Sequence, residues 1–249
     1  MHLIYPSLPY EVRTVDPLWE PECAWAREQG WAVSLYDSEA PRLWSTTATA
    51  EPAIYRGWML SAEEYELLTT RVALRVSTAS YLASHQASGW YDAIHPFTFP
   101  SAFGTAATLP DFSAGQRYFV KGLVKSFGTD SVVASQEQWM RLCRVHELLA
   151  TEPLFIRQFT PLQAGSERRF FVVDGVAYGA AATSLPDELW PVLALLQPRL
   201  YYSLDVAFTA AGHPVVVEVG DGQVSDLKEW STADFGHTVL GALARAIQS

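Results

Sequence analysis

The segment Tyr201-Tyr-Ser-Leu-Asp-Val-Ala-Phe-Thr-Ala-Ala-Gly-His-Pro-Val-Val-Val-Glu-Val-Gly-Asp-Gly222 contains two apolar runs that flank a turn. A hairpin symmetric about Ala211-Gly212 places Asp205 directly opposite Glu218, because each lies six residues from the centre. Opposed residues have Cβ atoms about 4.5–5.5 Å apart on one face of the sheet. Carboxylates at that distance repel each other unless a proton or a cation lies between them. The segment therefore predicts a site for a hard divalent cation such as Mg²⁺.

Two alternatives to this metal site follow from the same residues. A register slip of one residue would put the two carboxylates on opposite faces of the sheet. Asp205 and Glu218 would also be ordinary on an exposed strand face, but their apolar neighbours Leu204, Val206 and Val219 favour a buried position.

A second pattern is a lysine in a predicted strand, 117–123, followed by a loop that contains glycine. Lys121 lies in the strand, and Lys125, Ser126 and Gly128 follow it. Backbone N–H groups and a fixed ammonium group neutralise phosphate oxygens, so this segment suits phosphate binding. The glycine spacing is not that of a Walker motif, and a solvated lysine at a strand end is the alternative.

A third pattern is Glu167-Arg-Arg169, at the start of a hairpin whose turn is Asp174-Gly175. Adjacent strand residues point to opposite faces, so only the second arginine, Arg169, shares a face with Glu167. An arginine that faces a pocket binds carboxylate or phosphate through two parallel hydrogen bonds. A surface salt bridge between Arg169 and Glu167 is the alternative.

The rest of the chain alternates predicted strands and helices and contains no repeat. Ser61 and Glu64 form a capping box at the start of one helix. Residues 88–116 carry six glycines and prolines, which predict an irregular connection and a lobe boundary. We predict further strands at 2–5, 31–35, 53–58 and 154–159, and helices at 20–29, 61–74, 77–87, 135–150, 187–196 and 232–247.

The composition indicates a folded chain with an acidic surface. Of 249 residues, 49% are hydrophobic and 13% aromatic, which excludes a disordered polymer. The net charge of −10 disfavours non-specific nucleic-acid binding. Two cysteines are too few for a disulfide scaffold or a four-ligand zinc site, and no Gly-x-Ser-x-Gly or Gly-x-Gly-x-x-Gly motif occurs. With no signal peptide and no apolar segment of about 20 residues, we expect a cytoplasmic protein that does not enter a membrane.

The order of these motifs resembles that of ATP-grasp proteins. The strand with Lys121 and its glycine-containing loop comes first, and Ile156-Arg-Gln-Phe159 and Glu167-x-Arg169-x-Phe-Val-Val-x-Gly175 follow. Leu204-Asp-Val-Ala and Val216-Val-Glu-Val-Gly-Asp-Gly222 complete the series. Tyr55-Arg-Gly-Trp-Met-Leu-Ser61 through Trp90-Tyr91 also resembles the region before the core in a clade of small bacterial and phage members, so the resemblance covers most of the chain.

This resemblance implies an α+β protein with the ATP-grasp fold, in which two α+β lobes sandwich the nucleotide. Residues 1–88 would form a short N-terminal α/β region. The core would comprise an N-lobe of about 89–155 and a C-lobe of about 156–249.

The resemblance also assigns nucleotide-binding residues. Lys121 would contact the α-phosphate region, and the loop that includes Lys125, Ser126 and Gly128 would close over the β- and γ-phosphates. The strand 155–159 matches the hinge segment whose backbone binds adenine. The side chains expected near adenine are those of Ile156, Gln158 and Phe159.

Arg169 matches a catalytic arginine of the related ribosomal-protein glutamate ligases, and Asp205 and Glu218 match the family's Mg²⁺ ligands. The family's usual Glu-x-Asn metal pair reads Glu218-Val-Gly220 in this chain. Asp221, one position later, is predicted to replace the missing asparagine.

The activity that the resemblance implies is an ATP-dependent ligase that joins a carboxylate to an amine. The carboxylate would attack the γ-phosphate to give an acylphosphate and ADP, and the amine would then displace phosphate. The expected partners are small-molecule or peptide carboxylates and amines, with Arg56 and residues 88–105 as candidates for acceptor selection. Another ATP-dependent ligase or phosphotransferase of this fold, or a nucleotide-binding regulatory module with a degenerate site, is the alternative.

Overall fold

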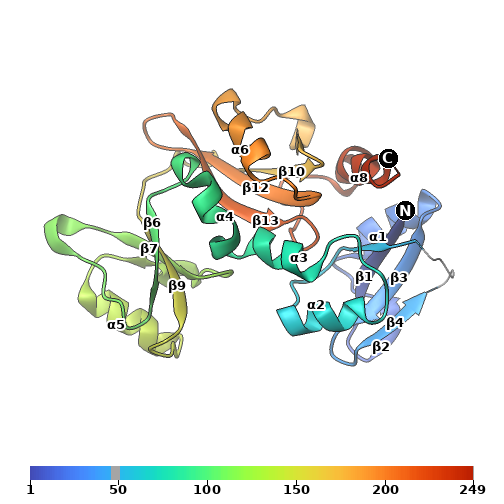
Figure 1. Ribbon diagram of the computed structural model, residues 1–249, viewed down its shortest axis with the longest axis horizontal. Helices are drawn as coiled ribbons and strands as arrows, with labels where there is room; N and C mark the ends of the chain where they lie inside the picture. Colours follow the sequence, from blue (N-terminus) through green and yellow to red (C-terminus); the bar gives the residue numbers. More distant parts are fainter. Residues whose placement is uncertain (46–50, 249) are drawn as a thin grey trace.

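The computed structural model describes residues 1–45 and 51–248, which form three sheets with helices packed against them (Figure 1). We call the sheet of β1 to β5 sheet I, the sheet of β6 to β9 sheet II and the sheet of β10 to β13 sheet III. Sheet II spans residues 101–158 and sheet III spans residues 168–221. None of the helices among the described residues has the length and apolar character that crossing a bilayer requires.

Sheet I forms the front of the chain. Its strand β1 pairs in parallel with β3 and β5 and antiparallel with β2, and β4 pairs with β3. The predicted capping box at Ser61 is present, because the Glu64 N–H donates to Ser61 Oγ and the Ser61 N–H donates to the Glu64 carboxylate. The elements are β1 (His2–Leu8), β2 (Glu11–Val15), α1 (Glu20–Glu28), β3 (Ala32–Asp37), β4 (Arg42–Ser45), β5 (Ala53–Tyr55) and α2 (Ala62–Thr69).

The prediction of an irregular connection at 88–116 is wrong for its first half. Gly89 lets α4 turn tightly after α3, since a Cβ at this position would lie 2.4 Å from the carbonyl oxygen of Ala83. Trp90 and Ile94 are buried beside Phe155, so the segment is helical through tertiary packing. The elements here are α3 (Thr78–His85), α4 (Ala87–Ile94), η1 (His95–Phe97), β6 (Ser101–Thr105) and η2 (Ser113–Gly115).

Sheet II has the strand order β6-β9-β7-β8. Helix α5 covers one face, where Trp139 packs with Val120 and Ile156. Because side chains alternate between the faces of a strand, Lys121 and Arg157 lie on the other face, which meets sheet III. The elements are β7 (Tyr118–Gly122), η3 (Gly128–Ser131), β8 (Val132–Val133), α5 (Gln136–Val145) and β9 (Pro153–Gln158).

Sheet III has the strand order β11-β10-β12-β13. Its predicted first turn is confirmed, with Asp174 at φ 47° and Gly175 at φ 78°, as a two-residue hairpin turn of this kind requires. The elements are β10 (Arg168–Val173), β11 (Val176–Gly179), η4 (Ala180–Ala182), η5 (Asp187–Leu189), α6 (Trp190–Leu195), β12 (Tyr201–Phe208), β13 (Pro214–Asp221), α7 (Thr232–Phe235), the π-helical turn η6 (Gly236–Leu240) and α8 (Gly241–Ala246).

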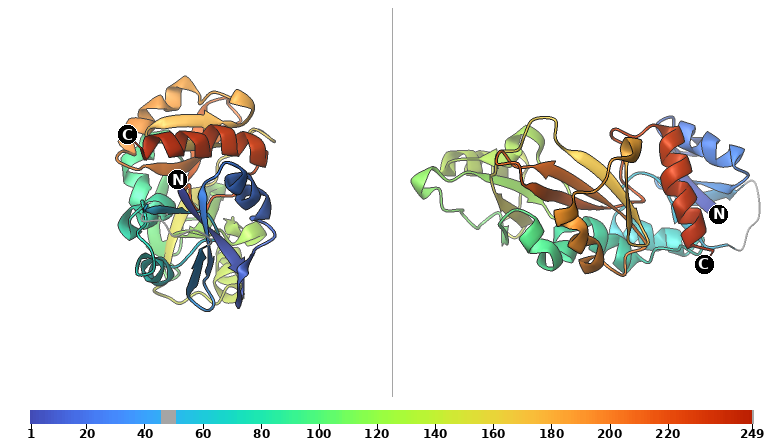
Figure 2. Two further views of the ribbon diagram at one scale, coloured as in Figure 1. Left: turned by 90° about the vertical axis from the view of Figure 1, so that its right-hand side faces the viewer. Right: turned by 90° about the horizontal axis from the view of Figure 1, so that it is seen from above.

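Sheets I and III share one hydrophobic core through the end of the chain. The C-terminal helical segment lies between the two sheets (Figure 2), and its residues Phe235, Val239 and Leu243 are buried. They pack in one cluster with Ile4 of sheet I and Phe171 of sheet III. The front of the chain is therefore fixed to the sheet that carries Asp205 and Glu218.

The hairpin of β12 and β13 pairs Asp205 directly with Glu218, so the predicted juxtaposition is confirmed. The route to that register differs from the symmetric count. Phe208 pairs with Pro214, which centres the turn on Ala211, and a β-bulge beside Asp205 then adds one residue, Val217, to β13.

Candidate active site

The two opposed carboxylates are each neutralised by a basic side chain. Asp205 accepts hydrogen bonds from Arg169 Nε at 2.8 Å and Nη2 at 2.7 Å, and from Lys228 Nζ at 2.8 Å. Glu218 forms an ion pair with Lys121, which lies across the space between sheets II and III. The expected repulsion between the carboxylates is thus relieved by cations of the protein itself.

These contacts fix the charge of Asp205. Burial alone would raise the pKa of this 5%-exposed carboxyl, but the hydrogen bonds and charge of Arg169, together with those of Lys228, outweigh it and lower the pKa. Arg169 also pairs with Asp226, while Glu167 pairs with Lys228. The alternative of an Arg169–Glu167 surface salt bridge is therefore not what the structure contains.

A cavity of about 400 Å³, which we call the Lys121 cavity, lies between sheets II and III. Of the residues that the sequence predicts for nucleotide and metal, Lys121, Ser126, Gln158, Phe159 and Glu218 all line it. One part of the lining is aromatic and the other carries the Lys121–Glu218 ion pair. The remaining lining residues are Phe99, Phe119, Arg157, Thr160, Leu162, Glu167 and Val217.

Three other predicted nucleotide-binding residues lie outside the Lys121 cavity. Lys125 and Gly128 are exposed on the loop after β7, where the Gly122 N–H donates to the Lys125 carbonyl at 2.9 Å. The Ile156 side chain faces α5 and belongs to the core on that side of sheet II. Alternation along β9 accounts for this, because Ile156 lies one residue from Arg157, which faces the cavity.

A second cavity, of about 300 Å³, adjoins the first at Glu218, which lines both. We call it the Asp221 cavity. Trp19 and Trp58 form one wall, with ring centroids 5.9 Å apart in an edge-to-face arrangement. His85 also lines it, and burial lowers the pKa of this imidazole to about 4, so His85 is neutral at pH 7. The further lining residues include Arg169, Asp205, Ser203, Gly220, Ser225 and Asp226.

The structure does not bring Asp221 together with the carboxylate pair. Asp221 lies three residues from Glu218, so its side chain leaves the strand on the opposite face, where it is fully buried. Its Oδ1 accepts hydrogen bonds from the Gln223 backbone N–H at 2.9 Å and from Gln223 Nε2 at 3.0 Å. Among the described residues, no three His, Cys, Asp or Glu side chains are close enough together to hold a metal ion.

The position of the family's asparagine is filled by other atoms. A Cβ on Gly220 would lie 2.6 Å from Ser203 Oγ and 3.0 Å from Ser225 Oγ, and these two hydroxyls are hydrogen-bonded at 2.7 Å. Glycine is therefore required there, and Asp221 does not occupy the vacated space. The prediction that Asp221 replaces the asparagine has no support in this geometry.

Asp221 should make stability fall as pH rises. Burial, only partly offset by the Gln223 hydrogen bonds, raises the pKa of Asp221 to about 7, above its value of about 4 in an unfolded chain. Between these values the native state binds more protons than the unfolded state, so the free energy of unfolding falls by up to about 1.4 kcal/mol per pH unit. Asp221→Asn should flatten this slope between pH 4 and 7 in urea titrations, and an unchanged slope would contradict the assignment.

Arg56, a candidate for acceptor selection, lines neither cavity. Its guanidinium is fully buried and pairs with Glu22 through Nε at 2.9 Å and Nη2 at 2.8 Å. It also donates to the carbonyls of Gly222 and Ser225 at 2.6 and 3.0 Å. Arg56 thus ties sheet I to the segment after β13. Of residues 88–105, Phe99 lines the Lys121 cavity.

Two site residues escaped the sequence analysis. Lys228 comes from the loop after β13, and no local pattern links it to Asp205. Arg157 lies within the quoted Ile-Arg-Gln-Phe segment, and the alternation of β9 gives a signal that was available, because Arg157 shares a face with Phe155.

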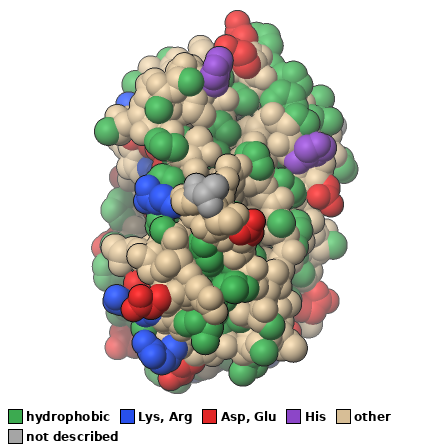
Figure 3. Space-filling model, turned by 90° about the vertical axis from the view of Figure 1, so that its left-hand side faces the viewer, with side chains coloured by type: hydrophobic (Ala, Val, Ile, Leu, Met, Phe, Trp, Pro, Cys, Tyr) green, Lys and Arg blue, Asp and Glu red, His purple; other side chains and the backbone are tan. Residues whose placement is uncertain are grey.

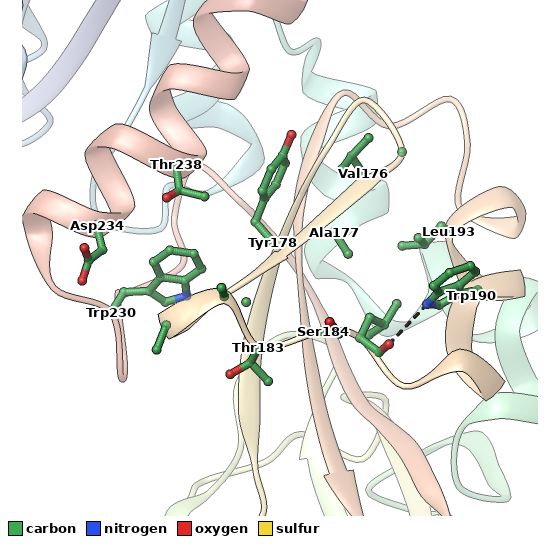
Figure 4. Close-up of a pocket in the computed structure, with 15 residues that line it drawn as sticks. Val176, Ala177, Tyr178, Thr183, Ser184, Trp190, Leu193, Trp230, Asp234 and Thr238 are labelled. Atoms are coloured by element: carbon green, nitrogen blue, oxygen red, sulfur yellow. Dashed lines mark hydrogen bonds between the residues drawn. The ribbon is translucent and has the colours of Figure 1, made fainter.

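The largest hollow of the described chain lies elsewhere. It measures about 600 Å³ and lies beside the edge strand β11, between Trp230 and Trp190 (Figure 4). None of the predicted site residues lines it. On the face of the molecule at the left of Figure 1, basic and acidic side chains are interspersed and no basic patch appears (Figure 3).

Comparison with solved structures confirms the predicted fold. D-cycloserine synthetase DcsG matches with a TM-score of 0.64 and 14% identity, over 99% of this chain and 98% of that one. A RimK domain ATP-grasp protein from Sphaerobacter thermophilus DSM 20745 matches with a TM-score of 0.64 and 14% identity over 100% of both chains. The ATP-grasp ligase PsnB, solved with a minimal precursor, Mg and ADP, gives 0.60 and 10% over 97% of each chain. Among curated proteins, no sequence matches this chain significantly.

The sequence itself matches a family model. The model describes an ATP-grasp domain, the third family of its clade, and it covers residues 39–247, which is most of the chain. This match confirms the resemblance that the motif order indicated. The chain belongs to this family of ATP-grasp domains.

Proposed function

We propose that this protein is an ATP-dependent ligase that joins a carboxylate to an amine through an acylphosphate, with release of ADP and phosphate. One observation carries the proposal. A cavity between two sheets contains the ion pair of Lys121, a phosphate-type cation, and Glu218, a metal-type acid. Membership of the ATP-grasp family, whose solved relatives include ligases, supports it.

In this proposal the nucleotide occupies the Lys121 cavity. The purine would lie at the aromatic part of the cavity, where Phe119 and Phe159 offer apolar surface. The backbone N–H groups of Gln158 and Phe159 donate to the carbonyls of Pro100 and Arg117, so the chain after Phe159 is the part left for the base. Lys121 and Ser126 would contact phosphate, and the loop with Lys125 and Gly128 would close over it.

The donor set fits Mg²⁺, with Asp205 and Glu218 as the proposed ligands. Mg²⁺ in nucleotide sites is commonly held by one or two carboxylates together with phosphate oxygens, so a third protein carboxylate is not needed. The cations that now neutralise the two acids, Lys121 and Arg169, are groups that phosphate oxygens also attract. When bound, the ion would neutralise phosphate charge.

The proposed reaction depends mainly on positioning and on charge neutralisation. Lys121 and Arg169 would hold phosphate oxygens while the substrate carboxylate attacks the γ-phosphorus and ADP leaves. The Asp221 cavity lies beside Glu218, and we propose that it holds the substrates. Its acidic groups and its Trp19–Trp58 wall suit an amine that carries an apolar group.

We also propose that the protein acts in the cytoplasm. Both cysteines are free thiols, Cys23 buried and Cys143 partly buried, which suits a reducing compartment. Residues 1–88 are proposed as the front region and residues 89–249 as the nucleotide-binding core, with the division near residue 155 lying between sheets II and III.

The test of ligase activity is ADP release from Mg-ATP, measured against panels of carboxylic acids and amines. The expected result is ADP and free phosphate that appear only when an acid and an amine are both present, with a matching amide seen by mass spectrometry. ADP release with a phosphorylated product and no need for an amine would indicate a phosphotransferase. Nucleotide binding without turnover on any pair would favour a regulatory module.

A further inference from the structure

Arg157 is a buried cation in the Lys121 cavity that neither the motif assignments nor the proposed reaction uses. It lies near the end of β9 in sheet II and is only 6% exposed. Its Nη1 donates to the carbonyl of Val217, the bulge residue of β13, at 2.8 Å. Its guanidinium carbon lies 4.9 Å from the ring centroid of Phe99 and 5.3 Å from that of Phe155. The guanidinium plane is therefore held in place by two rings and one hydrogen bond.

The other donors of Arg157 are unpaired. Within residues 1–45 and 51–248, neither Nε nor Nη2 has a hydrogen-bond partner, and no ion pair involves this side chain. Lys121, the other cation that lines the cavity, is paired with Glu218. A buried charge without a counter-ion is costly, and so are buried donors without acceptors. A polar ligand that brings negatively charged oxygens into the cavity would remove both costs.

We propose that Arg157 binds a phosphate group of the nucleotide through Nε and Nη2, while Nη1 stays on Val217. This inference rests on the proposed binding of nucleotide in the Lys121 cavity. The edge of a guanidinium group offers two parallel donors that match two oxygens of one phosphate, which a lysine does not offer. Unlike Lys121, Arg157 does not have to leave a carboxylate before it binds phosphate.

The same arrangement links phosphate binding to the contact between the two sheets. Arg157 belongs to sheet II and its acceptor Val217 belongs to sheet III. A phosphate on the outer donors of Arg157 would therefore bind a group that already bridges the sheets. The competing explanation is purely structural, in which Arg157 only holds the bulge of β13 in place.

Isothermal titration with Mg-ATP, Mg-ADP and adenosine separates these explanations. We expect Arg157→Met to weaken ATP and ADP binding about tenfold or more, since a charge-assisted pair of hydrogen bonds is lost. Adenosine affinity should change less than about twofold, because adenosine has no phosphate. Arg157→Lys, which keeps the charge but not the fork, should lie between Arg157→Met and the parent. Arg144→Met removes an exposed arginine from α5 and should leave all three affinities unchanged.

The structural explanation predicts a different pattern. If Arg157 only supports the bulge, the melting temperature falls and adenosine binding weakens as much as ATP binding, which would overturn the proposal. Equal ATP affinity in Arg157→Met and the parent would also overturn it. If Arg157→Met does not fold, the comparison of Arg157→Lys with the parent decides by the same ATP-to-adenosine ratio. A parent that binds none of the three ligands would refute nucleotide binding itself, and with it this role of Arg157.

Discussion

Glu218→Gln and Asp205→Asn should each lower Mg²⁺-dependent ATP turnover by roughly a hundredfold or more. A metal ion supplies several kcal/mol of charge stabilisation to phosphoryl transfer, and each 1.36 kcal/mol is a factor of about ten in rate. The two carboxylates are directly opposed on β12 and β13, so removing either one takes away half of the proposed ligand pair. Steady-state ADP release across a Mg²⁺ titration measures the effect.

Stability measurements separate a ligand role from a structural role. Asp205→Asn leaves Arg169 and Lys228 without their buried carboxylate, so it should destabilise the fold, by about 3–5 kcal/mol if the pair behaves as a buried one. Glu218 is 38% exposed in its side chain, so Glu218→Gln should cost much less. Glu137→Gln, on the exposed surface of α5, is the matched control for both. Normal turnover in a folded Glu218→Gln variant would remove Glu218 from the metal site.

The sequence predicts the central hairpin well because its evidence is local. Alternating apolar residues and a short turn place Asp205 beside Glu218, and a one-residue error in the turn centre is corrected by a bulge that no pattern announces. Lys121 was found for the same reason, since a strand and a glycine-containing loop lie next to each other in the sequence. The parity of β9 separates Ile156 from the cavity, and the motif assignment did not use that parity.

The features that the sequence does not reveal depend on distant segments. Lys228 reaches Asp205 from the loop after β13, and Arg56 reaches the Gly222 carbonyl from sheet I, at separations where no periodicity operates. Helix α4 owes its form to burial of Trp90, which outweighs the local preference of its glycine. The space at Gly220 is set by two serine hydroxyls whose meeting depends on the tertiary fold.

Lys121→Ala should weaken Mg-ATP binding by about ten- to a hundredfold. Lys121 is 3% exposed, and its ammonium group is the cation at the ion-paired side of the cavity. A hydrogen bond to a charged group contributes about 1.5–3 kcal/mol, which corresponds to this range of affinity. Because its partner Glu218 is partly exposed, the substitution should leave the fold intact, and circular dichroism checks this.

The most direct test of nucleotide binding between sheets II and III is the melting temperature of the parent and of Lys121→Ala across a Mg-ATP titration. Ligand that binds only the native state stabilises it by RT ln(1 + [L]/Kd), or about 2.7 kcal/mol at a hundredfold excess over Kd. We predict a clear rise for the parent at millimolar Mg-ATP and a much smaller rise for Lys121→Ala. No rise in the parent, or an equal rise in the two proteins, would contradict the assignment of the Lys121 cavity to the nucleotide.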